Sequence, residues 1–311
     1  MIDVVGKRHI WYAISAVLLI PGLIVLLWQG LALGIDFTGG TSWELQFQRP
    51  VDSQQIRSIL TEHGYTDSIV QTSQDNTILI RMKELKESSP EKAAIENDFR
   101  QQFGDFSELQ IETVGPTVGN AIRNRAIFAV ILASIGVLAY IAWAFRNTDS
   151  PVLYGSFAIV AMAHDVLFVL GVFAILGWVA DVEIDALFVT AVLTVMGFSV
   201  HDTIVVFDRI RENLAKRIAP TFEETVNYSV AQTMVRSLNT SLTVILTLAA
   251  LYLFGGESTR WFVFALLIGV AVGTYSSIFN ASQLLVSWRN GEIQRVFTFW
   301  RKPSGSRARA A

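Results

Sequence analysis

Long apolar runs alternate with polar segments along the chain, and their lengths indicate membrane-spanning helices. A helix needs about 20 predominantly apolar residues to cross the hydrocarbon core of a bilayer. Runs that approach or exceed this length occupy residues 10–28, 126–145, 152–177, 184–207, 238–254 and 261–286. Tryptophans at or near the ends of these runs, such as Trp28 and Trp178, are typical of a membrane interface. The pattern predicts a multi-pass α-helical membrane protein with six transmembrane helices.

The segment between the first two runs has the periodicities of a soluble α+β domain. Asp52 and Ser89 are residue types that begin helices, and apolar residues at helical spacing follow each of them. Strands are predicted at 41–48, 68–72, 77–83 and 109–114. The order strand, helix, strand, strand, helix, strand is that of a ferredoxin-like domain. Just before it, GIDFTGG at 34–40 is predicted to be a tight turn, with an ion site at Asp36 as the alternative.

Composition and charge exclude several classes of protein. Hydrophobic residues make up 52% and charged residues 16% of the chain, against about 25% charged in a typical soluble domain. The formal net charge of −3 argues against a basic nucleic-acid-binding module. The absence of cysteine excludes disulfides and thiolate-ligated zinc. The scattered histidines form no zinc motif, so neither a metal, a cofactor nor an enzymatic activity is expected.

The distribution of Lys and Arg orients the predicted helices. If the N-terminus lies inside, the short outside loops 178–183 and 255–260 contain only Arg260, and basic clusters fall in inside segments. We therefore expect both termini in the cytoplasm and the protein in the plasma (cytoplasmic or inner) membrane. The predicted parts are 1–29 for the cytoplasmic N-terminus and first helix, 30–125 for the extracytoplasmic domain, 126–287 for the other five helices, and 288–311 for a basic cytoplasmic tail.

Ionisable side chains within the predicted spans are candidates for function, because a charge costs about 2.5–3.5 kcal/mol or more in a bilayer. Aspartates fall inside the third and fourth spans, each directly after a histidine, and an arginine precedes the fifth span. A stripe of hydroxyl residues at helical spacing follows that arginine. The candidate proton-pathway residues are Asp202, Arg236, Asp165, His201 and His164, and the candidate lining residues are Thr240, Thr243, Ser199 and Asn280.

We interpret these residues as a polar, partly hydrated route for protons. A nearby arginine favours the charged form of a carboxylate and desolvation favours the neutral form, so movement of Arg236 relative to Asp202 would make Asp202 release and bind a proton. Structural interpretations stay open. Asp202 and Arg236 can form a purely structural ion pair, Asp165 can be a simple hydrogen-bond acceptor, and the histidines can be polar lining. The small and hydroxyl residues can serve close helix packing or bond back to their own helix.

Four motifs resemble one family of membrane proteins. GFSVHDTIVVFDRIREN at 197–213 resembles the signature G-[FY]-S-x-N-D-T-I-V-V-F-D-R-I-R-E-N of SecF members of the SecD/SecF family of protein-export membrane proteins. GIDFTGG at 34–40, AHD at 163–165 and TMVRS at 233–237 resemble further motifs of that family. The similarity covers the whole chain, including the number of spans and the position of the large loop. One departure is His201, because the family usually has Asn before the motif aspartate.

The resemblance implies a function that the residues alone do not. SecF members pair with SecD in a pseudo-symmetric unit of the resistance-nodulation-division superfamily. They work with the SecYEG translocon on unfolded pre-proteins, with YajC as a further candidate partner, and use the proton gradient after the SecA step. The motif match implies that Asp202 and Arg236 take part in proton flow. Alternatives are a half-transporter that exports small molecules and a passive assembly subunit; an intramembrane aspartyl protease is disfavoured because no GxGD motif occurs.

Overall fold

The computed structural model describes residues 3–72, 75–146 and 150–299 of the chain. The chain divides into two compact units. The first combines residues 1–30, 131–179 and 190–311, and the second combines 31–130 with 180–189. Of the predicted basic tail, 288–311, residues 300–311 lie outside the described residues.

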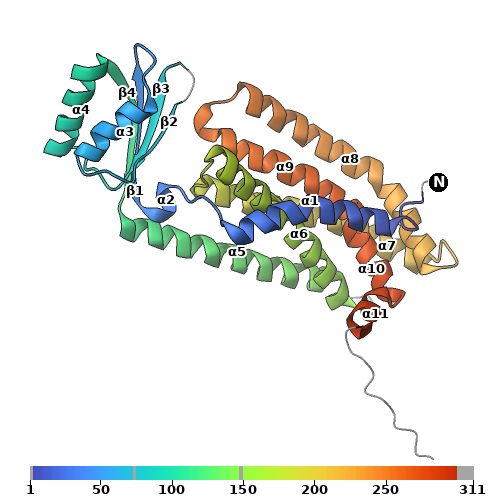
Figure 1. The fold of residues 1–311 in the computed structure, drawn as a ribbon. Helices are drawn as coiled ribbons and strands as arrows, with labels where there is room; N and C mark the ends of the chain where they lie inside the picture. The colour runs from blue at the N-terminus through green and yellow to red at the C-terminus, as the bar shows by residue number, and fades with distance from the viewer. Residues whose placement is uncertain (1–2, 73–74, 147–149, 300–311) are drawn as a thin grey trace, which may run out of the picture. The chain divides into compact units, whose positions relative to one another are not determined.

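Within the described residues, six helices are long and apolar enough to cross a membrane (Figure 1). They are α1 (Arg8–Trp28), α5 (Pro116–Ala144), α6 (Pro151–Ala180), α7 (Ala186–Lys216), α8 (Phe222–Phe254), and the continuous stretch of α9 (Arg260–Ser276), η2 (Ser277–Ala281) and α10 (Ser282–Arg289). The six-helix membrane class predicted from the apolar runs is confirmed. Short helices η1 (Glu257–Thr259) and α11 (Glu292–Phe299) flank the last of them.

Most of these helices extend beyond the apolar runs, since polar residues continue the helix outside the hydrophobic stretch. The clearest example is α8, which begins at Phe222, well before the apolar run that starts at 238. Thr221 caps it by accepting a hydrogen bond from the backbone N–H of Glu224, and the Glu224 carboxylate bonds back to the Thr221 N–H. Such a capping box satisfies two backbone donors that the first helical turn leaves unpaired.

The helices of the first unit differ in how much of their surface the chain itself covers. In α6, α7 and α9–α10, 39 to 56% of the most apolar window is buried, against 6 to 11% in α1, α5 and α8. Glycines bring α1 against α6, because a Cβ added to Gly22 would lie 2.7 Å from the Cα of Gly171. Small residues allow such close contacts between membrane helices. The interior of this unit is therefore built by α6, α7 and α9–α10.

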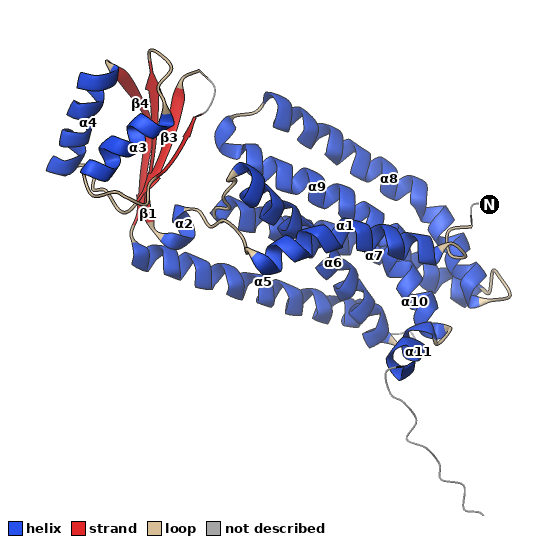
Figure 2. Cartoon of the chain, in the orientation of Figure 1, coloured by secondary structure: helices blue, strands red, loops and turns tan. Residues whose placement is uncertain are grey.

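The second unit contains one antiparallel sheet with the strand order β2-β3-β1-β4 (Figure 2). Its elements are β1 (Gly40–Phe47), α3 (Ser53–Glu62), β2 (Ile69–Thr72), β3 (Thr77–Met82), α4 (Pro90–Phe103) and β4 (Phe106–Val114). The predicted order of strands and helices and the small α+β domain are confirmed. Asp52 and Ser89 cap the two helices as expected, accepting hydrogen bonds from the backbone N–H groups of Gln54 and Lys92.

Both helices of this unit pack on one face of the sheet (Figure 2). The fully buried side chains between them include Trp43, Leu45, Ile80, Ile95 and Phe99. Alternate positions along β1 and β3 face away from this core and are only partly buried. The alternation along the strands therefore gives a sheet with a single apolar face.

The GIDFTGG motif forms a helical turn, α2 (Ile35–Thr38), followed by two glycines with positive φ. The tight turn expected here is thus a single turn of helix. The Asp36 carboxylate accepts a hydrogen bond of 2.8 Å from the backbone N–H of Ala186, where α7 begins. This contact gives Asp36 a structural partner, because acidic groups stabilise helix N-termini.

Arg81 of β3 forms a second contact with the segment before α7, an ion pair of 2.9 Å with Glu183. Burial raises the pKa of the Glu183 carboxyl, and the charge of Arg81 partly opposes this shift. Arg81 and Asp36 thus both hold residues 183–186, which lead directly into α7.

Candidate functional site

The first intramembrane aspartate, Asp165 of α6, is completely buried and well hydrogen-bonded. Ser199 of α7 donates a hydrogen bond of 2.6 Å to its Oδ2 atom. The Nδ1 atom of the adjacent His164 lies 2.9 Å from Oδ1. Small neighbours on the same face of α6, Ala158 and Ala161, are also buried. The backbone carbonyl of Ala161 accepts a 3.4 Å hydrogen bond from Ser276 of α9, so the last membrane helix also packs against this part of α6.

A polar chain continues from His164 towards α1. The Nε2 atom of His164 lies 3.3 Å from the amide Nδ2 of Asn280, and Ser15 of α1 donates a 3.0 Å hydrogen bond to the Asn280 Oδ1. Since the amide nitrogen is a donor, Nε2 accepts, which assigns the ring proton to Nδ1 and makes it the donor to Asp165. Asp165, His164, Asn280 and Ser15 therefore form one network across three helices.

Asn280 lies in η2, a π-helical turn that interrupts the last membrane helix. Such turns are rare and occur frequently at functional sites. In the same turn, Ser277 donates a 3.1 Å hydrogen bond to the backbone carbonyl of Ser199 and lies 3.0 Å from the hydroxyl of Thr203. The π-turn therefore places polar groups from the last helix against the part of α7 that carries Ser199.

The second aspartate, Asp202 of α7, is almost as buried but has weaker contacts. It is 2% exposed, and its nearest donor is the hydroxyl of Ser241 in α8, at 3.5 Å. Ser241 is itself bound by Thr274 of α9 at 2.6 Å. The Nδ1 atom of His201 lies 3.8 Å from Asp202, and the His201 side chain is 67% exposed. Ser241 and Thr274 were missed by the sequence analysis.

Arg236 lies on an exposed face of α8. Within the described residues it forms no ion pair with Asp202, so the structural salt bridge considered from the sequence is not present. Thr240 and Thr243 lie on the same exposed face and donate hydrogen bonds to their own helix carbonyls. The buried hydroxyl face of α8 is the neighbouring one, with Thr233, Ser237 and Ser241.

This arrangement has a direct chemical consequence for Asp202. A buried carboxylate without a paired cation is costly in a bilayer, whereas a protonated carboxyl is not. The protonation state of Asp202 therefore depends on whether water or a cation reaches it.

Ser237, one turn before Ser241, has a buried hydroxyl with no partner in the described part of the chain. In the same described residues, no group of three or more His, Asp and Glu side chains could hold a metal ion.

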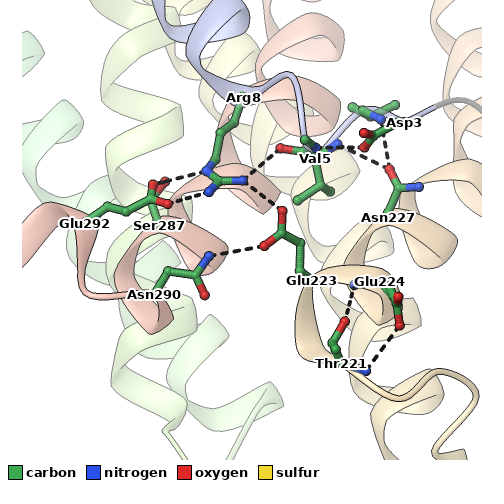
Figure 3. Close-up of polar contacts among 12 residues, drawn as sticks. Asp3, Val5, Arg8, Thr221, Glu223, Glu224, Asn227, Ser287, Asn290 and Glu292 are labelled. Carbon is green, nitrogen blue, oxygen red and sulfur yellow. Dashed lines mark hydrogen bonds and ion pairs between the residues drawn. The ribbon is translucent and has the colours of Figure 1, made fainter.

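A separate polar cluster joins three chain segments near the N-terminus (Figure 3). Arg8 of α1 is bound to Glu223 of α8 at 2.9 Å, and to both carboxylate oxygens of Glu292 in α11. Ser287 and Asn290 donate further hydrogen bonds to Glu292 and Glu223. The hydrogen bonds from Arg8 lower the pKa of the Glu292 carboxyl to about 2. We call these residues the Arg8 cluster; the sequence analysis did not find it.

The fold and these centres define the chain as a polytopic membrane protein with buried carboxylates in its helical bundle and an α+β domain after its first helix. Residues 94–291 match the family model described as protein export membrane protein SecD/SecF, C-terminal, and residues 25–51 match the SecD/SecF GG motif. The chain belongs to the SecD/SecF family. The four sequence motifs noted above all lie within these matched residues.

Relatives and solved structures agree with this assignment. Protein translocase subunit SecF of Thermobaculum terrenum is 56% identical over 307 residues, which cover 96% of this chain and 97% of that protein. Protein translocase subunit SecF of Anaerolinea thermophila is 42% identical and is covered completely. The crystal structure of SecDF, a translocon-associated membrane protein from Thermus thermophilus, superimposes with a TM-score of 0.81 at 33% identity. That match covers 93% of this chain but 39% of the SecDF chain.

Proposed function

We propose that this chain is the SecF-type subunit of the Sec protein-export machinery. It pairs with a SecD-type subunit and uses the proton gradient to promote late steps of pre-protein translocation through SecYEG. YajC is a further proposed partner. The observation that carries this proposal is the weakly bonded, buried carboxyl of Asp202, which can bind or release a proton when its surroundings change.

Polar residues on exposed faces support the pairing with a second membrane subunit. Arg236 and His201 lie on exposed faces of α8 and α7. A charged side chain facing hydrocarbon costs about 2.5–3.5 kcal/mol, so a partner or water must cover these faces in the membrane. Thr194 and Gly197 are also exposed on α7, and small residues of this kind mediate helix packing. A SecD-type partner supplies the missing helices, since SecDF of Thermus thermophilus is much longer than this chain.

The proposed place of the protein is the cytoplasmic membrane, with both termini inside and the α+β domain outside. Reporter fusions at Glu87, in that domain, and at Lys216, at the end of α7, are expected to report opposite sides of the membrane. Activity of one reporter at both positions would contradict the topology.

Co-purification from native membranes tests the proposed partners. A tagged chain is expected to bring down a SecD-type subunit and a translocon, identified by mass spectrometry. Gly197→Leu on α7 is expected to reduce the recovery of the SecD-type subunit at least severalfold, because nothing in the chain lies within 4 Å of a Cβ added there. Gly136→Leu on α5, equally unobstructed, is the control and is expected to bind normally. Equal recovery with both variants would contradict a partner face on α7.

A further inference from the structure

Two adjoining hollows lie where α7, α8 and α10 meet at the end of the bundle. One has a volume of about 520 Å³ and the other about 620 Å³, and Leu214, Phe222 and Arg289 line both. Arg217, Thr221 and Thr225 line the first hollow, and Tyr154, Arg211 and Trp288 line the second. Among the described residues that line them, three are arginines and none is acidic. The hollows therefore have a basic lining at the end of apolar helices.

Two of the three arginines have no carboxylate partner in the described part of the chain. Arg211 is neutralised by Asp208 at 2.5 Å. Arg217 and Arg289 form no ion pair there, and the guanidinium of Arg289 is held 4.3 Å from the ring centre of Phe222. Guanidinium groups bind phosphate oxygens with paired N–H donors, so two of them beside one hollow suit a phosphate group.

The acidic residues at the start of α8 are bound elsewhere, which leaves these arginine charges uncompensated. Glu223 is turned towards Arg8 and Asn290, and Glu224 bonds back to the backbone of Thr221 (Figure 3). Glu223 directly follows Phe222, which lines both hollows. Because the Glu223 carboxylate is bound in the Arg8 cluster, it does not pair with the arginines of the hollows.

The position of Arg289 fits the headgroup layer of a membrane. It follows the apolar run that ends at 286 by about one helical turn, or roughly 5 Å along the axis. The headgroup layer adds roughly 5–8 Å to each side of the hydrocarbon core. Trp288, which lines the second hollow, is a residue type enriched at that level. Basic pockets between membrane helices at this depth bind anionic lipid headgroups.

We propose that Arg217 and Arg289 bind a phosphate group in these hollows, of the kind carried by the headgroup of an anionic phospholipid. The guanidinium groups hold the phosphate oxygens, and the apolar side chains of Leu214 and Trp288 lie beside the bound molecule. The site is separate from the aspartates of the bundle and does not depend on their proposed role.

The backbone at Arg217 provides a variant that keeps the fold. Its φ of +50° is in the left-handed region, which Asn adopts more readily than Arg. Arg217→Asn therefore removes the charge while suiting the turn, and Arg289→Gln removes the second charge. Arg209→Gln/Lys216→Gln is the matched control: it also removes two positive charges, both residues lie on α7 just before Arg217, and both are bound to Glu212 rather than lining a hollow.

The test uses the full chain purified in detergent. Native mass spectrometry with added phosphatidylglycerol is expected to give binding about thirtyfold weaker for the Arg217→Asn/Arg289→Gln double variant, since each of the two basic residues contributes about 1 kcal/mol near an anionic lipid. The control is expected to stay within about twofold of the unmodified chain, and phosphatidylcholine is expected to bind equally to all three.

A parallel measurement distinguishes a lipid from a free anion. Stabilisation of the detergent-solubilised chain by inorganic phosphate, lost in the double variant, would support the same site with a soluble phosphate as its ligand. The proposal is overturned if phosphatidylglycerol and inorganic phosphate both act equally on the double variant, the control and the unmodified chain. Thermal midpoints measured without ligand verify that the variants are folded.

Discussion

Two aspartates lie inside the helical bundle with almost equal burial but unequal bonding. Asp165 receives a 2.6 Å hydrogen bond from Ser199 and lies 2.9 Å from His164. In the described part of the chain, the donor nearest to Asp202 is the hydroxyl of Ser241 at 3.5 Å, and the Nδ1 atom of His201 lies 3.8 Å away. His164 connects Asp165 to a network that reaches Ser15 of α1, whereas the hydroxyl of Ser241 accepts a hydrogen bond from Thr274 of α9.

This difference indicates separate roles for two residues that look alike in the sequence. A carboxyl with short, directed hydrogen bonds is held in one position and rigidifies the helices around it. A carboxyl with one long contact gains little from its present partner and can exchange it for water or a cation. We therefore propose a structural role for Asp165 and a proton-binding role for Asp202, and the predictions below test this division.

The largest expected effect is on transport by Asp202→Asn. The change removes the titrating proton but keeps the shape, so expression and association with a SecD-type partner are expected to persist. Gradient-dependent release of a pre-protein into membrane vesicles is expected to be abolished, and Asp202→Glu is expected to retain part of it. A full response of the Asp202→Asn protein to an imposed proton gradient would leave Asp202 with a structural role only.

The second prediction concerns stability. Here changes at Asp165 are expected to have a larger effect than changes at Asp202. Asp165→Ala leaves the buried hydroxyl of Ser199 and the Nδ1 atom of His164 without the partner they have in the structure, at a cost of about 1–3 kcal/mol for each unsatisfied group. Ser199→Ala is expected to cost about 1 kcal/mol, the net value of one hydrogen bond. Thermal unfolding in detergent should therefore show a clear decrease for both variants and little change for Asp202→Asn. Equal destabilisation by the Asp165 and Asp202 variants would remove the contrast between them.

The sequence predicted the elements of the fold better than the contacts of the site. Asp52 and Ser89 identify the starts of α3 and α4 because a capping side chain acts within a few residues. The buried face of α8 could not be identified in the same way. Thr233, Ser237 and Ser241 repeat at helical spacing as well as Arg236, Thr240 and Thr243 do. Lipid is as apolar as a bundle interior, so hydrophobicity does not distinguish the buried stripe from the exposed one.

Other parts of the site depend on tertiary contacts that have no local signal. The π-turn η2 is an example, since no residue type marks it in the sequence, although Asn280 within it was identified as a lining residue. The Arg8 cluster joins residues from α1, α8 and α11, which are far apart in the chain. By contrast, Asp165 and Asp202 could be found directly, because an ionisable residue in an apolar run is conspicuous.

The third prediction separates Arg236 from the internal site. Because Arg236 is exposed and forms no ion pair in the described residues, Arg236→Gln is expected to leave the thermal stability of the isolated chain within about 0.5 kcal/mol. In the complete complex it is expected to reduce gradient-dependent export, and Arg236→Lys is expected to reduce it less, since a charge remains while the planar group is lost. Strong destabilisation of the isolated chain by Arg236→Gln would mean that Arg236 belongs to the bundle interior.

Glu292 is expected to make the stability of the chain depend on pH independently of either aspartate. This dependence sets the lowest pH at which Asp165 and Asp202 can be titrated in the folded protein. The pKa of Glu292 is lowered from 4.5 to about 2 in the folded protein, mainly by its hydrogen bond from Arg8. A lowered folded-state pKa gives stability that is complete above the unfolded value and is lost as pH falls through the folded value. The thermal midpoint of the chain is therefore expected to fall from about pH 5 downwards, and the Glu292→Gln variant to lack this component. Identical pH profiles for the two proteins would contradict the ion pair.

The smallest effect is expected from His201, although it lies next to the more important aspartate. Its side chain is 67% exposed and its Nδ1 atom is 3.8 Å from Asp202, beyond hydrogen-bond distance. His201→Asn is therefore expected to keep the stability of the isolated chain and to keep gradient-dependent export within about twofold, because removing a surface contact usually costs less than 0.5 kcal/mol. His164→Asn is the matched comparison. His164 is bound to Asp165 on one side and to Asn280 on the other, so its loss is expected to lower the thermal midpoint. If His201→Asn abolishes export instead, the proton on Asp202 must be shared with that ring, and Asp202 and His201 act as one titrating pair.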